Sequence, residues 1–413
     1  MKTVVLSCYD INPYKGSESG TGWNFSYQIS KHYNVIAITR ENNKDKIDEF
    51  IDKFNIDTSN LSFEYYDLPY YLRFWKKGNR GSFIYYNLWQ IGLPLFILRK
   101  KFKFDFTQHI NFHADHVPSF LWILGKPFIW GPINHNEPMR KFFIRSNSYL
   151  LQDRFKFLLK WLRWNLDPFL ILCKNKAALI IGSSVAVKER LNIKDNKFKL
   201  LTTVSSQIPH SRFNKEQILS TNEKFTVISV GRLVPIKSFD ISINSFDLFY
   251  KRLSYEQKKL VQLKIVGSGP SKKKLVKLAS QLESRNSIHF IDWIDQSDLF
   301  KLYMRSNIML TPSHEGAGAV LAEGFSYGLP IICFNGYGSG EIIDSSCGIK
   351  VDINSNHDTN RLYADAIESL YKDDGLYSEL SRGALKKFNN ELSWEIKGKM
   401  LHTFYMENVF NEQ

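Results

Sequence analysis

The sequence predicts an α/β protein made of two units, each a doubly wound parallel sheet with helices on both faces. Short apolar runs alternate with segments of helical period along the whole chain, as such sheets require. The length of 413 residues favours two domains, because a single hydrophobic core rarely grows beyond about 250 to 300 residues. A hydrophobic content of 43% supplies enough side chains for two cores.

The apolar runs fall into two series on either side of a polar stretch at 205–223. The first series consists of residues 4–7, 35–39, 127–131 and 178–184, and the second of residues 225–231, 263–267, 288–293, 308–313 and 330–334. We therefore expect a Rossmann-like unit over residues 1–205 and a second over 206–391, with a helix at about 392–413 packing back on the first. A ligand is expected in a cleft between the two units, at the carboxyl ends of the strands.

The charge and the cysteines restrict the partners and the compartment. A net charge of +14 suits nucleic acid, an anionic membrane surface or a phosphorylated substrate. The four cysteines show no CxxC spacing, which predicts buried thiols in a reducing, cytoplasmic compartment. The first apolar run meets Asp10 too early for a signal peptide, and the apolar segment 83–98 is interrupted by polar residues and a proline, so no spanning helix is expected.

The stretch HEGAGAVLAEGFSYGLPII, residues 314–332, contains two glutamates eight positions apart. It follows a predicted strand, and a helix is expected over residues 319–327. The first amides of that helix form a site for phosphate oxygens. Glu315, before the helix, suits sugar hydroxyls because a carboxylate would repel phosphate, and Glu323, one turn inside, can accept hydrogen bonds from a ribose diol. The alternative is an ordinary solvated helix start with favourable acidic residues.

A second candidate is VGRLVPIKSFD, residues 230–240, where Arg232 and Lys237 surround a turn at the end of a predicted strand. Two cations at the carboxyl end of a strand suit a diphosphate leaving group, whose charge grows as its bond breaks. The alternative is two surface cations in a lysine-rich protein.

The loop after the first strand, YDINPYKGSESGTGW, is rich in glycine. Gly16, Ser17, Gly20 and Gly22 predict a loop that lays backbone amides against phosphate. The spacing matches neither GxGxxG nor GxxxxGK[ST], so the pattern is also typical of an ordinary loop.

The segment FDFTQHINFHADH, residues 104–116, ends a strand pattern with three histidines, His109, His113 and His116. They lack an HExxH arrangement. Three interpretations stay open: a metal site, structural histidines, and histidines that contact a substrate.

Two segments of the first unit interleave cations with aromatic and aliphatic residues, at 71–81 and 142–164. Such composition suits a membrane surface. The alternative is an amphipathic helix that packs on its own sheet.

Together these residues resemble the retaining glycosyltransferases of family 4, which have the GT-B architecture of two Rossmann-like domains facing across a cleft. The resemblance covers nearly the whole chain, and its most specific part is the E-x7-E pair inside PSHEGAGAVLAEGFSYGLPII, after GRLVPIK, IVGSGP and FIDWIDQSDLFKLYMRSNIML. PYKGSESGTGW and IWGPINHNE are similar to a bacterial subgroup that builds surface polysaccharides. That subgroup usually has GPxGGGE in the second stretch, where this chain has Asn134, His135 and Asn136.

The resemblance implies a role for each matching residue. It implies that Arg232 and Lys237 bind the diphosphate, that Glu315 contacts sugar hydroxyls and that Glu323 contacts the ribose. It further implies donor contacts by Gly16, Ser17, Trp293, Ile294, Gly318, Ala319 and Val320. A histidine after the fourth strand faces the acceptor in this family, and both His109 and His113 fit that position.

The family's chemistry implies transfer with retention, by attack on the face that the diphosphate leaves, with no metal and no cofactor. The implied partners are a nucleotide sugar and a polyprenyl-diphosphate-linked saccharide or another glycan acceptor, as in O-antigen, capsule or exopolysaccharide synthesis. The implied location is the cytoplasmic face of the cell membrane, with peripheral contact to anionic lipid.

Two other classes were weighed against this one. Another GT-B enzyme, inverting or phosphorylase-like, is disfavoured by the E-x7-E pair and by the lack of a lysine motif for a pyridoxal cofactor. A basic nucleic-acid-binding protein is disfavoured because no RNP, KH or helix-turn-helix signature occurs, so no nucleic-acid partner is expected. The sequence does not specify the donor sugar, base, acceptor, linkage or oligomeric state.

Overall fold

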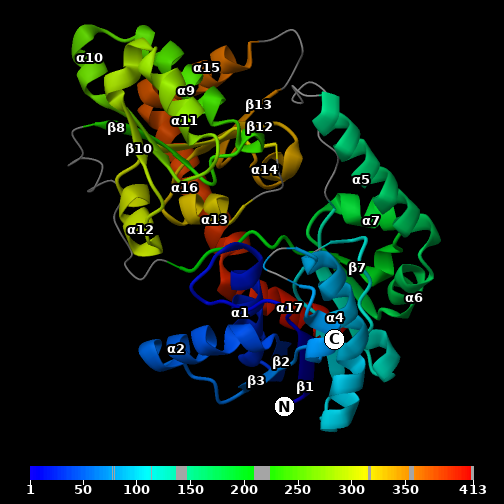
Figure 1. Ribbon diagram of the computed structural model, residues 1–413. Helices are drawn as coiled ribbons and strands as arrows, with labels where there is room; N and C mark the ends of the chain where they lie inside the picture. Colours follow the sequence, from blue (N-terminus) through cyan, green and yellow to red (C-terminus); the bar gives the residue numbers. More distant parts are fainter. Residues whose placement is uncertain are drawn as a thin grey trace. The chain divides into compact units, whose positions relative to one another are not determined.

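The computed structural model describes residues 1–76, 78, 80–112, 114–135, 147–208, 224–314, 318–352 and 358–410. Among the residues expected in the functional site, Glu315 and His113 lie outside this part of the chain. The chain divides into two compact units (Figure 1). Unit 1 contains Met1–Thr203 and Lys397–Gln413, and unit 2 contains Val204–Ile396.

Unit 1 contains a parallel sheet of seven strands in the order β3-β2-β1-β4-β5-β6-β7. The strands are β1 (Thr3–Ser7), β2 (Asn34–Thr39), β3 (Leu61–Tyr65), β4 (Phe106–His109), β5 (Phe128–Ile133), β6 (Leu179–Gly182) and β7 (Phe198–Leu200). Val5 of β1 pairs with Ile36 on one side and Thr107 on the other, so the first strand lies inside the sheet. The predicted doubly wound parallel sheet is confirmed in this unit.

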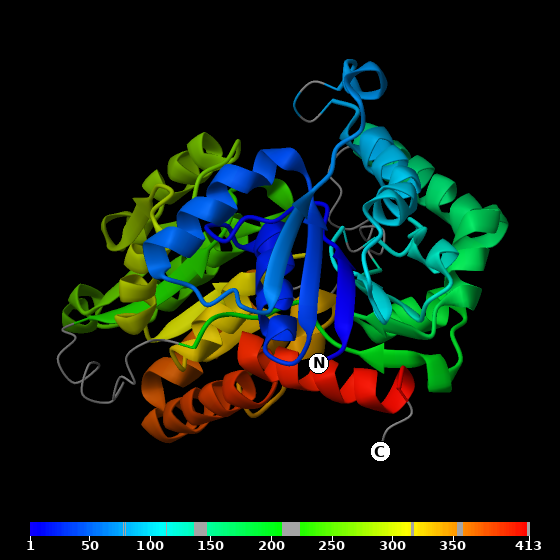
Figure 2. The same cartoon turned by 90° about the horizontal axis from the view of Figure 1, so that it is seen from below.

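Helices cover both faces of the unit 1 sheet. They are α1 (Ser17–Ser30), α2 (Lys44–Phe54), α3 (Tyr70–Arg73), α4 (Ser82–Lys100), α5 (Asn147–Leu166), α6 (Pro168–Lys176) and α7 (Val185–Leu191). The buried residues of α4, α6 and α7 share one core with Val5 and Trp130. Figure 2 shows α3 projecting away from the strands of this unit.

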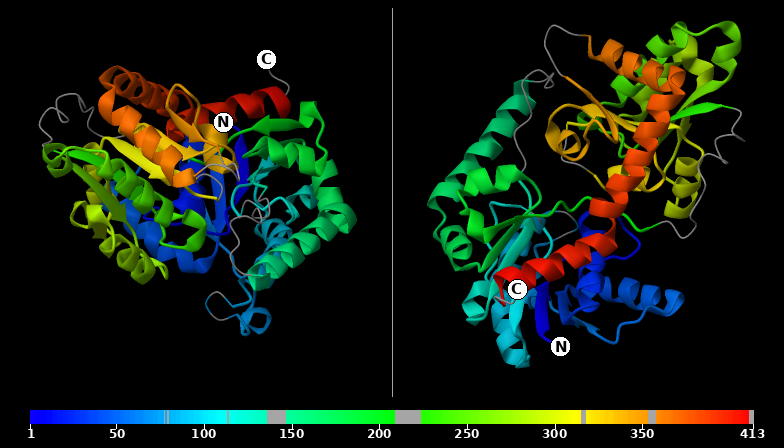
Figure 3. Two further views of the ribbon diagram at one scale, coloured as in Figure 1. Left: turned by 90° about the horizontal axis from the view of Figure 1, so that it is seen from above. Right: turned by 180° about the vertical axis from the view of Figure 1, so that it is seen from behind.

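The last helix, α17 (Trp394–Asn408), begins in unit 2 and belongs to unit 1 from Lys397 onward (Figure 3). Tyr405 of this helix is fully buried and its hydroxyl donates a hydrogen bond to Gln108 of β4. Its ring centroid lies 5.5 Å from that of Tyr33 and 5.2 Å from that of Phe106. The helix is therefore part of the hydrophobic core of unit 1.

Unit 2 contains a parallel sheet of six strands in the order β10-β9-β8-β11-β12-β13. The strands are β8 (Phe225–Val230), β9 (Val261–Val266), β10 (Ile288–Ile291), β11 (Ile308–Thr311), β12 (Ile331–Phe334) and β13 (Gly348–Val351). All five strands predicted for this unit are confirmed. The chain places β9 and β10 on one side of β8, then crosses to place β11 on the other.

The helices of unit 2 are α9 (Phe239–Lys251), α10 (Tyr255–Lys259), α11 (Lys272–Ser280), α12 (Gln296–Met304), α13 (Ala319–Ser326), α14 (Tyr337–Ile342), α15 (Thr359–Lys372) and α16 (Asp374–Lys387). One core joins the sheet to α9, α11 and α15. A second core contains residues of α12, α13 and α16 and lies on the other face, as Figure 1 shows. Within the described residues, no helix combines the length and the apolar character needed to cross a bilayer.

Candidate active site

A pocket opens in unit 2 between the residues that end and follow strands β8 and β11. It encloses about 340 Å³, part of which is open to solvent. Because β9 lies on the other side of β8, the gap between β8 and β11 is the point where the strand order reverses. Open parallel sheets bind their ligands at this point, outside the carboxyl ends of the strands.

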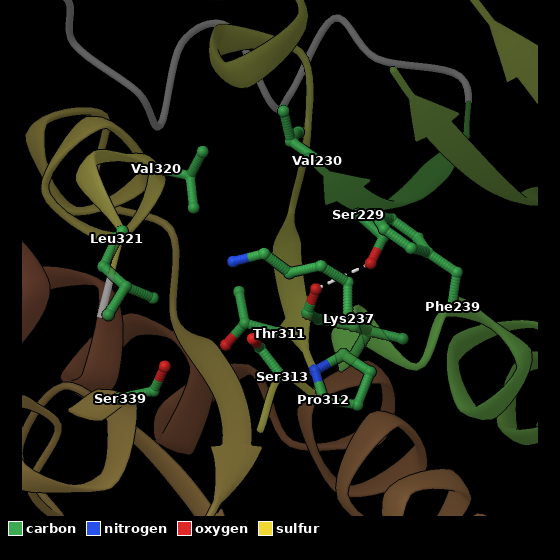
Figure 4. Close-up of a pocket in the computed structure, with 12 residues that line it drawn as sticks. Ser229, Val230, Lys237, Phe239, Thr311, Pro312, Ser313, Val320, Leu321 and Ser339 are labelled. Carbon is green, nitrogen blue, oxygen red and sulfur yellow. Dashed lines mark hydrogen bonds between the residues drawn. The ribbon is translucent and has the colours of Figure 1, made fainter. Parts of the chain in front are cut away.

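Lys237 is the cation that lines this pocket. It ends the short 3-10 turn η5 (Pro235–Lys237), which follows β8. The backbone holds the turn in place, since the His314 amide donates to the Ile236 carbonyl over 3.0 Å. Figure 4 shows the Lys237 side chain extending across the pocket toward Val320. A hydrogen bond of 2.7 Å from Ser229 Oγ to the Leu310 carbonyl joins β8 and β11 beneath it.

Arg232 lies on the same loop as Lys237 but does not line the pocket. Its side chain is exposed. Between the two cations, Leu233 is fully buried, and its backbone exchanges hydrogen bonds with Ser268 and Ser271. The loop is therefore anchored at its centre, with one cation turned into the pocket and the other into solvent.

The amino end of α13 forms another wall of the pocket. Gly318 occupies the N-cap position with an extended backbone and no side-chain cap, and both Gly318 and Val320 line the pocket. The first amides of a helix have no partner within the helix and carry partial positive charge. The helix predicted over residues 319–327 is confirmed, and Gly328 follows it with a φ of +63°. This wall therefore offers hydrogen-bond donors to the same space as the Lys237 ammonium group.

Glu323 lies one turn inside α13, and its carboxylate is buried. The hydroxyl of Tyr303 in α12 donates a hydrogen bond of 2.9 Å to Glu323 Oε2. Burial raises the pKa of Glu323, and hydrogen bonds from Tyr303 and Gln296 offset part of that effect. Glu323 is the one glutamate of the E-x7-E pair that lies among the described residues. The side chains that donate hydrogen bonds to its carboxylate belong to α12.

Trp293 and Ile294, expected near the base, follow the edge strand β10. Trp293 has 74% of its surface exposed, and its amide donates to Ser268 Oγ over 3.3 Å. Ile294 packs against the core on the α12 side of the sheet. Neither residue lines the pocket beside Lys237.

In unit 1, Gly16 is the N-cap of α1 and Ser17 is its first residue. Gly20 and Gly22 therefore lie inside a helix, which corrects the prediction that all four residues form one loop. A Cβ atom at Gly22 would lie 2.6 Å from the Asp10 carbonyl oxygen, so these glycines let α1 approach the loop after β1. This close approach of the backbone explains the glycines at positions 20 and 22.

His109 is the last residue of β4 and is 1% exposed. Its Nε2 atom lies 3.3 Å from the Tyr86 hydroxyl of α4. Of the two histidines expected to face an acceptor, the described one is thus enclosed in the core of unit 1.

Sequence reasoning missed a buried charged cluster at the carboxyl ends of β4 and β5. His135 Nδ1 lies 2.7 Å from Asp115 Oδ2, and His116 Nδ1 lies 3.6 Å from the other carboxylate oxygen. Burial alone would raise the pKa of Asp115, but the two histidines hold it below its usual value. The motifs HADH and INHNE carry these residues, but nothing in the spacing indicated that they meet. Within the described residues, no group of three or more histidine, cysteine or acidic side chains is arranged to hold a metal ion.

Part of the chain, including the pocket, matches a family of known proteins. Residues 211–387 match the family model described as glycosyl transferases group 1. The matched residues all lie in unit 2. The matched residues include Lys237, Arg232, α13 and the whole pocket.

Two curated proteins match part of this chain. An uncharacterized glycosyltransferase of Haemophilus influenzae is 34% identical over 140 residues, which are 34% of this chain and 37% of that protein. The alpha-monoglucosyldiacylglycerol synthase of Acholeplasma laidlawii is 28% identical over 119 residues, or 29% of each chain. The matched stretches span about a third of these relatives' own length.

Solved structures show that the fold extends over both units. HepE of Anabaena in complex with UDP has a TM-score of 0.63 and 14% identity, covering 98% of this chain and 100% of that one. WaaG, a glycosyltransferase involved in lipopolysaccharide biosynthesis, has a TM-score of 0.62 and 15% identity, covering 97% and 99%. Sucrose-phosphate synthase of Thermosynechococcus elongatus has a TM-score of 0.66 and 15% identity, covering 98% and 99%. The predicted GT-B fold of two parallel-sheet units is confirmed.

The burial of Glu323 leads to a prediction about the stability of the protein. Because its pKa is raised in the folded protein, ionisation disfavours the folded state progressively as pH rises above the unfolded value of 4.5. Glu323→Gln cannot ionise, and its side-chain oxygen still accepts the Tyr303 hydrogen bond. We expect the variant to gain stability over the wild type between pH 5 and pH 8 in urea unfolding.

Glu379→Gln is the matched control, because Glu379 is an exposed glutamate of α16. If the difference in unfolding free energy between Glu323→Gln and the wild type were the same at pH 5 and pH 8, the raised pKa of Glu323 would be contradicted.

Proposed function

We propose that the protein transfers a sugar from a nucleotide-diphosphate sugar to a lipid-linked or saccharide acceptor in surface-polysaccharide synthesis, as a hexosyltransferase of class EC 2.4. The observation that carries the proposal is the pocket at the switch point, where the Lys237 ammonium and the amino end of α13 line one space. Cations and helix amides are the groups that stabilise a departing diphosphate. HepE, which has the same fold, was solved with UDP and with UDP-glucose, and this supports a nucleotide sugar as donor.

The proposed mechanism retains the anomeric configuration. The bond between the anomeric carbon and the diphosphate oxygen breaks, and the acceptor oxygen bonds to the same face of that carbon. The acceptor proton passes to the diphosphate oxygen that leaves. Lys237 and the α13 amides neutralise the growing negative charge, with Arg232 as a second cation from the same loop. The proposal therefore includes neither a metal nor an organic cofactor.

Other residues of the domain are proposed to hold the rest of the donor. Glu323 accepts hydrogen bonds from the ribose through carboxylate lone pairs that the Tyr303 hydrogen bond to Oε2 does not use. Glu315 contacts the transferred sugar, and the loop with Trp293 and Ile294 contacts the base. Gly16 and Ser17 at the start of α1 are proposed donor contacts from unit 1.

The assignment of Lys237 is tested by substitution. We expect Lys237→Ala and Arg232→Ala each to lower turnover by roughly 10²-fold, the typical loss of a preorganised electrostatic contact to a transition state. Turnover is measured as release of nucleoside diphosphate from a panel of nucleotide sugars, which also identifies the donor. Lys259→Ala, an exposed lysine of α10, should keep the wild-type rate.

Wild-type rates in both site variants would overturn the leaving-group assignment. The same assay in excess EDTA should proceed at an unchanged rate, and loss of activity that Mn²⁺ or Mg²⁺ restores would overturn the metal-free mechanism.

A peripheral position at the inner face of the cell membrane is the second part of the proposal, and charge supports it. Residues 70–172 contain sixteen lysines and arginines against five acidic residues, which is +11 of the chain's net +14. The same segment contains 21 of the 31 large apolar side chains that are exposed in the described residues. Positive charge and exposed apolar surface together are what an anionic bilayer attracts.

Helix α4 illustrates the apolar part of this surface. It buries Tyr86, Trp89 and Leu93 against the sheet, yet its opposite side exposes Ile84, Ile91 and other apolar residues to 36–59%. A helix that is apolar on all sides requires cover on its outer side. Helix α3 adds Tyr70 and Tyr71, exposed to 76% and 71%, on the projection seen in Figure 2. The positive charge would repel a second copy, so we propose lipid as the cover.

The membrane face is tested with vesicles. We expect the wild type to sediment with vesicles that contain phosphatidylglycerol, in a salt-sensitive way, and not with phosphatidylcholine alone. Ile91→Glu with Leu95→Glu should abolish sedimentation, since both apolar residues of α4 are more than half exposed. The control is Tyr255→Glu with Leu260→Glu, which adds the same charge at exposed apolar residues of unit 2.

Equal loss in both double variants would show a general charge effect and contradict the proposed face. Dimers that the α4 substitutions dissociate would show that a second copy covers it instead.

A further inference from the structure

Two arginines of unit 1 lie on aromatic rings and have no carboxylate partner in the described chain. The Arg163 guanidinium carbon of α5 lies 5.1 Å from the centroid of the Phe83 ring. The Arg190 guanidinium carbon of α7 lies 4.7 Å from the Trp164 ring and 5.6 Å from the Phe157 ring. A guanidinium stacked on a ring keeps its in-plane N–H donors available at its edge.

Arg163 has a hydrogen-bond donor that is buried and, within the described part of the chain, unsatisfied. Its Nη1 atom is buried and has no hydrogen-bond partner among the described residues. A guanidinium stays charged at every relevant pH, and a buried charged donor without an acceptor is costly. An anion that accepts from Nη1 would remove this cost.

Within the described residues, no ion pair joins a carboxylate to either arginine. The buried carboxylate of the cluster, Asp115, is 2.7 Å from His135 and 3.6 Å from His116. His135 and His116 in turn pack against the Trp164 ring, with centroids 5.1 Å and 6.5 Å away. The buried carboxylate is thus matched by imidazoles, and the arginines above the aromatic rings are left for a ligand.

The position of this cluster indicates what kind of anion it takes. Asp115 and His135 follow β4 and β5, at the sheet edge where a doubly wound unit binds ligands. Phe83 belongs to α4 and Trp164 to α5, the helices that carry the exposed apolar surface. A ligand here would have an anionic group next to the arginines and an apolar chain along α4 or α5.

We infer that Arg163 and Arg190 bind the diphosphate of a lipid-linked acceptor, with Phe83, Phe157 and Trp164 as the platform beneath the two guanidiniums. This inference rests on the proposed function, because it assumes that the acceptor is a lipid diphosphate. Two guanidiniums match the charge and the oxygen geometry of a diphosphate. A soluble phosphate compound shares that chemistry but would not use the apolar helices.

The test measures binding by calorimetry and does not depend on catalysis. The probe is farnesyl diphosphate, a short lipid diphosphate, compared with inorganic diphosphate and with farnesol. We expect farnesyl diphosphate to bind most tightly, and Arg163→Gln and Arg190→Gln each to weaken it by about tenfold or more, the loss of one charge-assisted contact. Arg163→Lys should recover only part of the affinity, because lysine cannot bind in two-point fashion.

Arg154→Gln is the matched control, since Arg154 is an exposed cation of the same helix α5. An equal loss of farnesyl diphosphate affinity in Arg154→Gln would show that the ligand is held by general charge attraction, and would overturn the proposed site. Equal affinity for farnesol would overturn the role of the diphosphate. Equal affinity for inorganic diphosphate would overturn the lipid as ligand. Arg190 is exposed, so its variant keeps the test valid if Arg163→Gln does not fold.

UDP binding in the same proteins separates this inference from the proposed function. Intact UDP binding with no farnesyl diphosphate binding would reject the acceptor site alone. Farnesyl diphosphate binding without binding of either UDP or GDP would reject the donor proposal instead.

Discussion

The reversal of strand order at β8 determines where the pocket of unit 2 lies. Parallel strands all end at one edge of a sheet, and the reversal leaves a gap between the loops after β8 and β11. The first loop carries Lys237 and the second leads into α13. The strand order alone therefore brings a cation and the amino end of a helix to the same pocket. The Ser229 to Leu310 hydrogen bond and the contact between His314 and Ile236 keep these two loops in register.

The fold followed from the sequence because buried parallel strands are continuous apolar runs. All strands of the second sheet that were expected are present, and α13 begins at the expected residue. The strands β3, β7 and β13 were missed, since β3 is only partly buried, β7 has three residues with mixed polarity, and β13 has only four residues, one of them exposed. A short or half-exposed strand has no strong apolar pattern to detect.

The site was predictable only in part. Lys237 and Gly318 were found because the loop and helix start have local signatures, and both line the pocket. The burial of Glu323 against Tyr303 and the pairing of Asp115 with His135 depend on tertiary contacts between segments at least 20 residues apart, which no spacing rule reveals. The glycines at 20 and 22 were assigned to a loop because a glycine lets other atoms come close to the backbone. The sequence does not show whether those atoms belong to a ligand or, as here, to the chain itself.

Recognition of a diphosphate by the pocket beside Lys237 can be measured by calorimetry with two pairs of nucleotides, UDP with UMP and GDP with GMP. One additional phosphate that accepts charge-assisted hydrogen bonds contributes about 1.5 to 3 kcal/mol, or roughly tenfold or more in affinity. We expect the nucleoside diphosphate of the preferred base to bind about tenfold more tightly than its monophosphate, and this difference to disappear in Lys237→Ala. Equal affinities for diphosphate and monophosphate in the wild type would contradict diphosphate recognition by this pocket.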